Sequence, residues 1–556
     1  MAVSLLITAI LITVTFAPHA YGLNQDAQIE AAPGDLDITF GSAGKTTVNV
    51  FSLSAQASAL AVQADGKLVA VGNVSTGFGD FALARFNVDG TLDPNFGNGG
   101  TVATDFFGSS DSAHAVVIQK DGKIVVAGNA SRGGPNNEGY DLAIARYNTN
   151  GTLDPSFGVG GKVTGDLSGH TDYGAALALL PDGKLILGGT GLFDSSTEAG
   201  DFELVRYNSD GSFDPTFGNG PVPGRAITDF FGHPDFLEAI AVQSDGRILA
   251  AGLTYLKPNE GKEQFALARY NADGTLDQTF GSGGKVNTQF PGQIAEANAI
   301  SLTSNGKIIL AGTAFSSQAD FALARYNSDG SLDTAFGVGG TVTTDFAGRD
   351  DSAEALCIQS DNKILVAGRR MLSSNSDTTD FALARYNADG SLDSGFGSGG
   401  KTSTDFSGLG DVAQAMALQS DGKVILGGYS FHPTGPTTSA FEMSLARYTT
   451  GGLTAPGFSL SFEESPVTAD RGAAVKVHIL INRTGGFNGN VTISPPDTSD
   501  IGVKVKPPVP LSTTDSTVTF KLKIKAGATV GHFPLTFSGQ DDSGHVAAAT
   551  ITLFIQ

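Results

Sequence analysis

A two-residue turn recurs seven times along the chain and constrains its fold more than any other feature. The turn is found at Asp65-Gly66, Asp121-Gly122, Asp182-Gly183, Asp245-Gly246, Asn305-Gly306, Asp361-Asn362 and Asp421-Gly422, with successive spacings of 56, 61, 63, 60, 56 and 60 residues. Each copy lies between two apolar runs, and such dipeptides tolerate the positive φ angles of a type I′ hairpin. The pattern predicts seven β-hairpins in a repeat of about sixty residues.

Each repeat contains four extended segments, which in the second repeat lie at 101–106, 113–119, 123–127 and 141–147. In the fourth segment of the first repeat, Phe81 and Leu83 alternate with Ala82 and Ala84, so both faces are apolar. A sheet with two apolar faces must be covered on both. The sequence therefore predicts an all-β fold, a seven-bladed β-propeller of four-stranded antiparallel blades. A parallel β-helix is the alternative, but its coils are much shorter than these repeats.

Almost all length variation lies in one class of connection; the exception is three extra residues around 221–224, between the fourth segment of the third repeat and the next repeat. Between the third and fourth segments the connections contain 7 to 13 residues (73–79, 129–140, 190–200, 253–263, 313–319, 369–379 and 429–441). By contrast, the connection from the fourth segment to the next repeat recurs nearly unchanged, as in 327–340 and 387–400. Antiparallel order places the variable connections on the rim opposite the Asp-Gly turns, and insertions that collect on one rim indicate a binding face.

The pattern Ala-Arg-Tyr-Asn-x-Asp-Gly-Ser-Leu-Asp-x-x-Phe-Gly-x-Gly-Gly, present at 324–340 and 384–400, resembles the bacterial delta-sixty repeat family of predicted β-propellers. The resemblance covers residues 34–456 and implies an exported or surface protein with no established activity. In residues 457–556, alternating apolar runs predict a β-sandwich. The segment 483–489 there resembles bacterial immunoglobulin-like modules, which implies a spacer or an adhesion unit.

The ends and the charge of the chain indicate its compartment. A 13-residue apolar run at 5–17, followed by small residues, predicts a secretory signal peptide at 1–22 and a linker at 23–33, hence an extracellular or cell-surface protein. No second run predicts a membrane span in the mature chain. Lys and Arg number 34 against 56 Asp and Glu, and the net charge of −22 argues against nucleic-acid binding. The single Cys357 lies in an apolar run and is expected to be a buried small hydrophobe.

The connection from the fourth segment to the next repeat resembles a calcium-binding loop, because Asn87, Asp89, Gly90 and Asp93 match part of that pattern. Arg85, however, stands at the first ligand position, where its positive charge would repel a cation. The same arginine recurs in every repeat, at Arg85, Arg146, Arg206, Arg269, Arg325, Arg385 and Arg447. Seven acids occupy the later position, at Asp37, Asp93, Asp154, Asp214, Asp277, Asp333 and Asp393. We expect structural ion pairs between these two sets, either within a repeat or across to a neighbour, and no cofactor; calcium is the less favoured alternative.

A second polar set lies on the rim with variable connections. It comprises Asp111, Asp172, Asp235, Asp351 and Asp411, together with His114, His170 and His233. These carboxylates could form a ring that binds a cation or a cationic ligand near the axis, or they could be turn residues that follow glycine, which we favour. Residues 395–402 match the phosphate-loop pattern, but a strand and not a helix is expected to follow, so we expect no nucleotide site.

These features favour a non-catalytic binding scaffold that engages a protein or a polysaccharide at the cell surface through its variable connections. One alternative is an exported polysaccharide hydrolase or lyase that uses the axial Asp and His residues. The other is a purely structural protein of the cell envelope.

Overall fold

The structure is a computed structural model, which describes residues 31–556 except 76–77, 134–138, 166–170, 195–198, 219–222, 258–261, 291–293, 347, 374–377, 407–408, 434–438, 452–456, 463–466, 485–489, 497, 507–511, 514–516 and 542–545. The expected signal peptide at 1–22 and most of the expected linker at 23–33 lie outside the described residues. Within the part of the chain described, no helix has the length and the hydropathy needed to cross a membrane.

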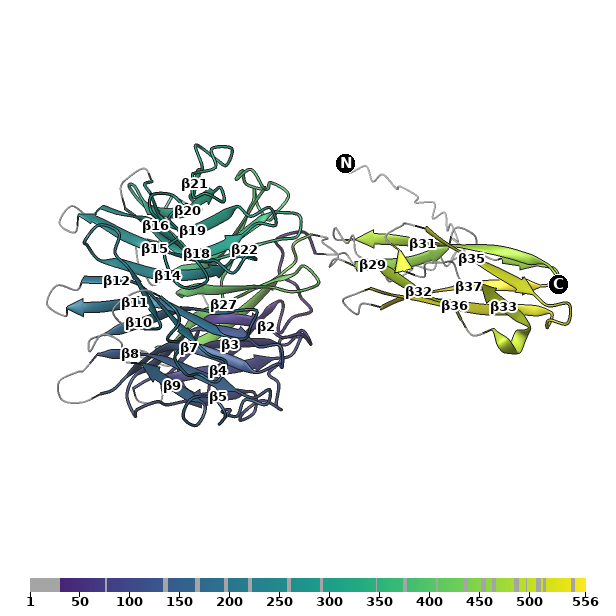
Figure 1. Cartoon of the computed structure of the whole chain (residues 1–556), viewed down its shortest axis with the longest axis horizontal. Helices are drawn as coiled ribbons and strands as arrows, with labels where there is room; N and C mark the ends of the chain where they lie inside the picture. The colour runs from purple at the N-terminus through teal and green to yellow at the C-terminus, as the bar shows by residue number, and fades with distance from the viewer. Residues whose placement is uncertain are drawn as a thin grey trace, which may run out of the picture.

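Seven four-stranded antiparallel sheets make up the first part of the chain, to the left in Figure 1, and form the blades of the predicted propeller. In order of their first strand, the sheets are β2 (Ala55–Val62), β3 (Leu68–Val74), β4 (Asp80–Phe86) and β5 (Thr101–Thr104); β6 (Asp111–Ile118), β7 (Ile124–Ser131), β8 (Tyr140–Tyr147) and β9 (Lys162–Gly165); β10 (Asp172–Leu179), β11 (Leu185–Asp194), β12 (Ala199–Tyr207) and β13 (Arg225–Thr228); β14 (Asp235–Val242), β15 (Ile248–Lys257), β16 (Lys262–Tyr270) and β17 (Lys285–Thr288); β18 (Ile294–Leu302), β19 (Ile308–Phe315), β20 (Ala319–Tyr326) and β21 (Thr341–Thr344); β22 (Asp351–Ile358), β23 (Ile364–Met371), β24 (Thr379–Tyr386) and β25 (Lys401–Thr404); and β26 (Asp411–Leu418), β27 (Val424–Pro433), β28 (Ser439–Tyr448) and β1 (Lys45–Val48). We number these blades 1 to 7.

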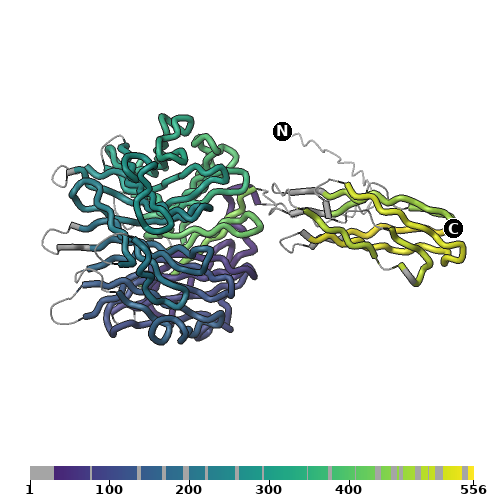
Figure 2. Tube along the Cα trace, in the orientation of Figure 1, coloured from purple at the N-terminus to yellow at the C-terminus, as the bar shows by residue number. Residues whose placement is uncertain are grey.

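The blades do not coincide with the sequence repeats. The first strands of neighbouring sheets, such as β2, β6 and β26, contact one another, so they lie innermost. The first extended segment of each repeat pairs at the outer edge of the preceding blade, and β1 therefore pairs with β28 of blade 7. The purple N-terminal segment and the green last blade thus lie side by side in Figure 2. This pairing between the two ends of the repeat array closes the ring.

The Asp-Gly turns join the first two strands of each blade, as predicted, but the prediction of type I′ geometry was wrong. Gly66 has a φ of 82°, but the φ of Asp65 is not positive, and a type I′ turn needs a positive φ at both residues. The Gly66 amide donates to the Gln63 carbonyl at 2.9 Å and the Gln63 amide donates to Lys67 at 2.8 Å. This is a type I turn followed by a left-handed residue, the three-residue hairpin. Asn362 takes that place in blade 6 with a φ of 65°.

The apolar core lies between blades. Phe81 and Leu83 pack with residues of blade 2 such as Ile124, while Ala82 and Ala84 of the same strand pack with Leu445 of blade 7. Seven such clusters, one at each junction, account for the large and small residues that alternate along the fourth segment of each repeat. Each blade is therefore stabilised by both of its neighbours.

We call the rim that carries the Asp-Gly turns the turn rim, and it contains the predicted ion pairs. In six of the seven pairs the arginine and the aspartate lie eight residues apart in the same repeat. Arg85 Nε donates to Asp93 Oδ2 at 2.9 Å, and the guanidinium lies 4.5 Å from the centre of the Phe96 ring. Lys67 donates to the same carboxylate oxygen at 2.8 Å. Both residues of the Arg85–Asp93 pair are buried, at 7% and 1% exposed. Burial raises the pKa of Asp93, but the contacts from Lys67, the Asn95 amide and Arg85 outweigh it and hold that pKa at about 2.

Each arginine also reaches the next blade. Arg85 Nη1 donates to the Thr149 carbonyl, and equivalent bonds run from Arg146 to Ser209, Arg206 to Ala272, Arg269 to Ser328, Arg325 to Ala388, Arg385 to Thr450 and Arg447 to Val88. The backbone follows the same path, since the Gly97 amide donates to the Asn150 carbonyl at 2.8 Å. Gly97 has a φ of +54°, and a Cβ there would lie 2.3 Å from the Thr101 carbonyl oxygen, so only glycine fits.

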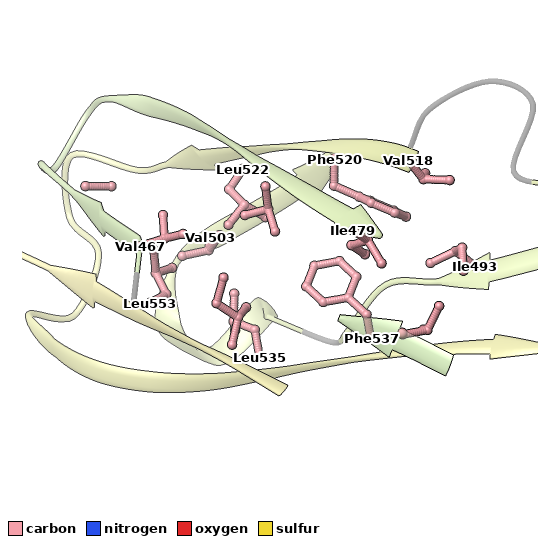
Figure 3. Close-up of a cluster of buried hydrophobic side chains, with 14 of the residues drawn as sticks. Val467, Ile479, Ile493, Val503, Val518, Phe520, Leu522, Leu535, Phe537 and Leu553 are labelled. Carbon is pink, nitrogen blue, oxygen red and sulfur yellow. The ribbon is translucent and has the colours of Figure 1, made fainter. Parts of the chain in front are cut away.

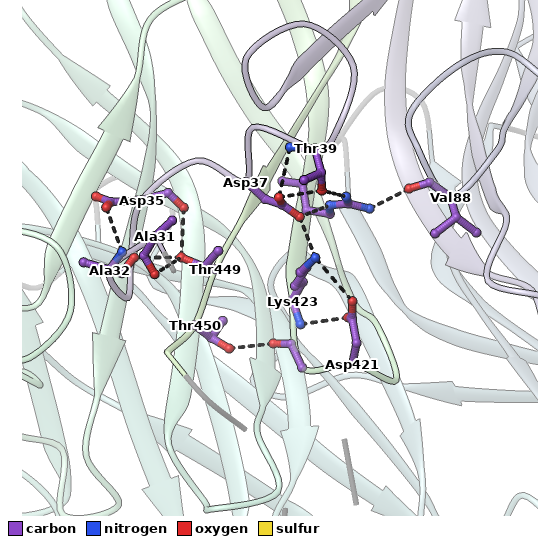
Figure 4. A network of polar contacts seen from close by, with 12 residues as sticks. Ala31, Ala32, Asp35, Asp37, Thr39, Val88, Asp421, Lys423, Thr449 and Thr450 are labelled. Atoms are coloured by element: carbon purple, nitrogen blue, oxygen red, sulfur yellow. Dashed lines mark hydrogen bonds and ion pairs between the residues drawn. The ribbon is translucent and has the colours of Figure 1, made fainter. Parts of the chain in front are cut away.

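The seventh ion pair closes the ring. Arg447 Nε donates to Asp37 Oδ2 at 2.8 Å, across 410 residues of sequence, and Lys423 contacts the same oxygen at 2.8 Å (Figure 4). Asp37 precedes the first blade in sequence but belongs in space to the last one. The ends of the repeat array are therefore joined by the same interaction that joins Arg and Asp within each other repeat.

The second part of the chain is built from two sheets around one core. The strands are β29 (Gly457–Phe462), β30 (Val467–Ala469), β31 (Ala474–Thr484), β32 (Val491–Ser494), β33 (Val503–Lys506), β34 (Ser512–Thr513), β35 (Thr517–Ile524), β36 (Gly531–Asp541) and β37 (Val546–Ile555), with a 3-10 turn at Ser499–Ile501. The sheet orders are β29-β31-β35-β33 and β30-β37-β36-β32-β34. Figure 3 shows Ile479 and Phe520 of the first sheet facing Leu535 and Phe537 of the second, which gives the predicted sandwich.

Cys357 lies on β22 and is half-buried. Its thiol donates to the Met416 sulfur at 3.1 Å, and burial raises its pKa to about 12. A thiol with so high a pKa is an apolar packing group at neutral pH.

We predict that Asp37→Asn and Asp93→Asn each lower the free energy of unfolding by about 3 kcal/mol, because each leaves a buried arginine without its carboxylate. Urea unfolding of the full chain measures both. Asp89→Asn is the control, since Asn150 already accepts the equivalent turn bonds from Thr152 in the next repeat. An Asp37 variant as stable as the wild type would show that the ring is not closed through this pair.

Candidate functional site

The rim opposite the Asp-Gly turns, here called the loop rim, carries the connections between the second and third strands of each blade and those between blades. Part of the length variation expected there lies in longer strands, because β27 and β28 have 10 residues each whereas β3 and β4 have 7. Hairpins with strands of unequal length therefore surround this rim; residues 195–198, 258–261 and 434–438 lie outside the described residues.

The five aspartates expected on this rim do not meet in one axial ring. Each begins the innermost strand of its blade, and each is at most 1% exposed, namely Asp111, Asp172, Asp235, Asp351 and Asp411. Asp111 Oδ2 accepts the Phe106 amide at 2.7 Å, so the carboxylate closes the connection that leads into its own strand. The same bond is made by Asp235, Asp351 and Asp411 to Phe230, Phe346 and Phe406. The favoured expectation was a local turn made by each aspartate after a glycine. Instead, each of these carboxylates accepts the amide of a phenylalanine five residues earlier in the chain.

Four of the five aspartates instead join clusters at the junctions between blades. In each cluster, one carboxylate comes from near the start of the third strand of a blade, one follows the outer strand of that blade, and one begins the next blade. The clusters are Asp80, Asp105 and Asp111; Asp201, Asp229 and Asp235; Asp320, Asp345 and Asp351; and Asp380, Asp405 and Asp411. Within each, one oxygen per residue lies within 4.8 Å of the others. Asp172 has Glu203 near it, and Glu203 pairs with Arg225.

The four clustered carboxylates that begin innermost strands have raised pKa values. Burial, followed by the charges of Asp105 and Asp80, raises the pKa of Asp111 to about 7 despite the bond from Phe106. The pKa values of Asp235 and Asp411 are raised to about 7 and that of Asp351 to about 6, with burial again the largest cause. A proton or a cation therefore stabilises these junctions at neutral pH.

The two described histidines of the set, His114 and His233, do not join the clusters. His114 lies at a bulge in the innermost strand, between Ala113 and Ala115, 3.3 Å from the Asn129 side chain, and burial lowers its pKa. His233 is half-buried in the connection before β14, and His170 lies outside the described residues.

The bulge at His114 recurs in every blade. The residues passed over by the strand register are Ser58, His114, Ala175, Glu238, Asn298, Glu354 and Gln414. The Glu238 side chain is exposed, but partial loss of water among the surrounding blades raises its pKa to about 7, with the charges of Glu296 and Glu354 as further causes. Bulges re-aim side chains, and these seven are all on the innermost strands. The bulge residues Glu238 and Glu354 could not be recognised from the sequence, because nothing in it marks a bulge.

Sequence reasoning also missed Asp80, Asp105 and their equivalents. Their signal was present as the recurring Thr-Asp-Phe after the outer strand and Asp-Phe at the start of the third strand. Each looks like an ordinary surface acid until the blades are placed next to one another.

Comparison with known proteins identifies the propeller class and gives no activity. Six segments match the β-propeller domain of unknown function DUF5122, at 63–96, 119–157, 180–217, 243–280, 303–336 and 359–396. Each runs from an Asp-Gly turn to a Phe of the turn rim. The chain therefore contains DUF5122 β-propeller repeats across residues 63–396. No curated protein matches the sequence.

Solved structures match at low similarity. A PL25 polysaccharide lyase, an ulvan lyase, matches with a TM-score of 0.39 and 11% identity, covering 72% of this chain and 95% of the lyase. A glucose dehydrogenase matches with a TM-score of 0.36 and 12% identity, covering 58% and 95%. Fibronectin(III)-like modules of Clostridium thermocellum CbhA match with a TM-score of 0.14 and 11% identity, covering 36% and 88%. Likeness at this level does not bear on activity.

We predict that, in chelator, the melting temperature falls as the pH rises from 5 to 8. In this range the folded chain binds more protons at these carboxylates than the unfolded chain does, so raising the pH removes stability. The combined variant Asp111→Asn, Asp235→Asn, Asp351→Asn and Asp411→Asn should have a clearly shallower slope in differential scanning calorimetry. An unchanged slope would contradict the raised pKa values. The turn-rim pairs do not interfere, because their aspartates titrate far below pH 5.

Proposed function

We propose that this chain is an exported or cell-surface protein of the delta-sixty repeat type, with an immunoglobulin-like C-terminal module. In this proposal its propeller is a non-catalytic scaffold that binds a protein or a polysaccharide through the loop rim. The observation that carries the proposal is the distribution of exposed aromatic side chains between the two rims.

The loop rim carries most of the exposed aromatic residues among those described. Its exposed large apolar residues are Phe51, Leu53, Phe78, Phe107, Tyr173, Phe231, Phe315 and Leu372, of which six are aromatic. On the turn rim they are Ile38, Val88, Val159, Phe213 and Val338, of which one is aromatic. Phe78 is 76% exposed. Aromatic side chains supply large contact areas at low entropic cost and are enriched at binding surfaces, so they favour the loop rim as the face that meets a partner.

The two rims also differ in how freely they can vary. On the turn rim the recurring arginine bonds an aspartate and lies over a phenylalanine ring, as Arg85 does with Asp93 and Phe96. The same arginine donates to a carbonyl of the next blade in all seven repeats. Nearly all changes in connection length lie on the loop rim, where an insertion leaves those bonds untouched; the exception is three extra residues in the turn-rim connection between β12 and β13. A scaffold that diversifies one face for binding is expected to have this organisation.

An exported polysaccharide hydrolase or lyase has less support. The five aspartates considered for that chemistry are at most 1% exposed, and at least four accept a backbone amide. A buried carboxylate in such a position does not reach a glycosidic bond. A purely structural envelope role predicts no ligand at all, which the next experiment tests.

We predict that Phe78→Ser, Phe107→Ser and Phe231→Ser combined weaken binding to isolated cell-envelope material by about tenfold or more, since exposed aromatics carry much of the energy of such contacts. The control combines Phe213→Ser, Val159→Ser and Val338→Ser on the turn rim, and it should bind as the wild type does. Sedimentation with envelope polysaccharide and with envelope protein, assayed separately, tells the two partner classes apart.

Shortening 429–441 to seven residues is the matched test on the loops. We expect little change in melting temperature, because blade 1 already has a connection of that length. Equal loss of binding in the turn-rim control, conversion of the polysaccharide to products, or no binding by the wild type would each contradict the proposal.

A further inference from the structure

The four three-carboxylate clusters each tie three elements of two neighbouring blades together. In the first, Asp80 belongs to β4 and Asp105 follows β5 in blade 1, whereas Asp111 begins β6 in blade 2. The same three places are used at the junctions of blades 3 and 4, 5 and 6, and 6 and 7. The clusters therefore lie where two blades would separate if the loop rim opened.

The geometry of the clusters fits a shared cation. One oxygen from each carboxylate lies within 4.8 Å of the other two. Calcium binds oxygen at 2.3–2.6 Å, so two ligands of one ion lie at most about twice that distance apart, which is close to 5 Å. Three carboxylates supply up to six oxygens, and calcium takes six to eight.

A buried oxygen in these clusters lacks a donor. Asp111 and Asp411 are 0% exposed and Asp351 is 1% exposed. Oδ2 of each accepts a backbone amide, while Oδ1 of each is buried and has no hydrogen-bond partner among the described residues. An acceptor in this position is costly unless a proton or a cation satisfies it.

The nearest lysine at each cluster is directed to the main chain. Lys162 Nζ donates to the Asp105 carbonyl oxygen at 3.0 Å, and Lys285, Lys401 and Lys45 make the same bond to Asp229, Asp345 and Asp405. The Lys162 ammonium thus bonds a main-chain oxygen at the edge of the first cluster and not a carboxylate of it. In the last cluster Asp380 also pairs with Arg370 at 2.8 Å, which makes that site the weakest of the four.

Two junctions of the same ring serve as internal comparisons. Between blades 4 and 5 the three places hold Gln264, Gln289 and Ala295, and between blades 7 and 1 they hold Glu442, Asn49 and Ala55. The lysine is replaced there as well, by Thr341 and Thr101. Asn49 donates directly to Glu442 at one junction, and at the other Gln264 accepts a bond from Asn287, a residue of β17 outside the three places. At these two junctions the full carboxylate set and its lysine are both missing. Between blades 2 and 3 the sequence keeps all three acids, Asp141, Asp166 and Asp172, but has Arg225 in place of the lysine.

We propose that these four clusters are calcium sites that hold neighbouring blades together beneath the loop rim. The ions supply the charge that the carboxylates lack and fix the base of the hairpins above them. This inference does not rest on the binding function proposed for the rim.

The test is calcium titration of the full chain after treatment with chelator, followed by calorimetry of binding and of unfolding. We expect saturable binding at up to four sites and a rise in melting temperature with calcium. The variant Asp105→Asn, Asp229→Asn, Asp345→Asn and Asp405→Asn should lower the affinity by about tenfold or more, because affinity follows the number of charged ligands. These four residues are exposed, and asparagine can still accept the bond that Asp105 receives from the Gly108 amide, so the variant should fold.

The matched control removes the same charge elsewhere. Asp65→Asn, Asp121→Asn, Asp182→Asn and Asp245→Asn change exposed turn residues, and Asn305 already occupies this place in blade 5. This variant should keep the calcium response of the wild type. Absence of calcium binding by the wild type, or an equal loss of response in both variants, would overturn the proposal. A melting temperature that rises on acidification but not with calcium would show that protons alone neutralise the clusters.

Discussion

The buried pair of an arginine with an aspartate, repeated seven times on the turn rim, is the interaction on which the rest of the structure depends. Each arginine bonds a carboxylate of its own repeat, stacks on a phenylalanine ring and donates to a carbonyl of the next blade. A guanidinium suits this task because its planar fork has donors for several acceptors at once. Seven equal contacts of this kind set the spacing of the blades, and Asp37 supplies the last of them from the opposite end of the array.

Because cohesion is concentrated on the turn rim and in the cores between blades, the loop rim can vary. Hairpins rise there to unequal heights, and exposed aromatic side chains gather there. The carboxylate clusters form a second layer of contact between blades at the base of these hairpins. Their like charges oppose blade contact unless neutralised, so the loop rim is the part of the ring whose cohesion is open to pH and cations.

Much of the fold follows from the sequence, and the reasons are local. A turn signal every sixty residues, a two-residue alternation of large and small side chains, and seven arginines matched by seven aspartates are enough to predict seven blades and their ion pairs. The type of turn was wrong, because Asp-Gly fits both a two-residue and a three-residue hairpin. The offset between repeat and blade could not be predicted, since it depends on which edge accepts β1.

The candidate site was less accessible to sequence reasoning, for a physical reason. Asp80, Asp105 and Asp111 come from three segments, and only the packing of blade 1 on blade 2 brings them together. Asp111 alone looks like a turn residue, and in part it is one, since it accepts the Phe106 amide. The bulge at Glu238 has no sequence signature either.

Native-state hydrogen exchange of the full chain tests the central claim, that one rim holds a closed ring while the other is free to vary. The amides of Gly41, Gly97, Gly158, Gly218, Gly281, Gly337 and Gly397 each donate across a junction of the turn rim. We expect all seven to exchange only when the whole propeller unfolds, and amides of the loop-rim connections to exchange much faster. Early exchange at Gly41 and Gly397, with the other five still protected, would show a ring that opens at its ends and would contradict this account.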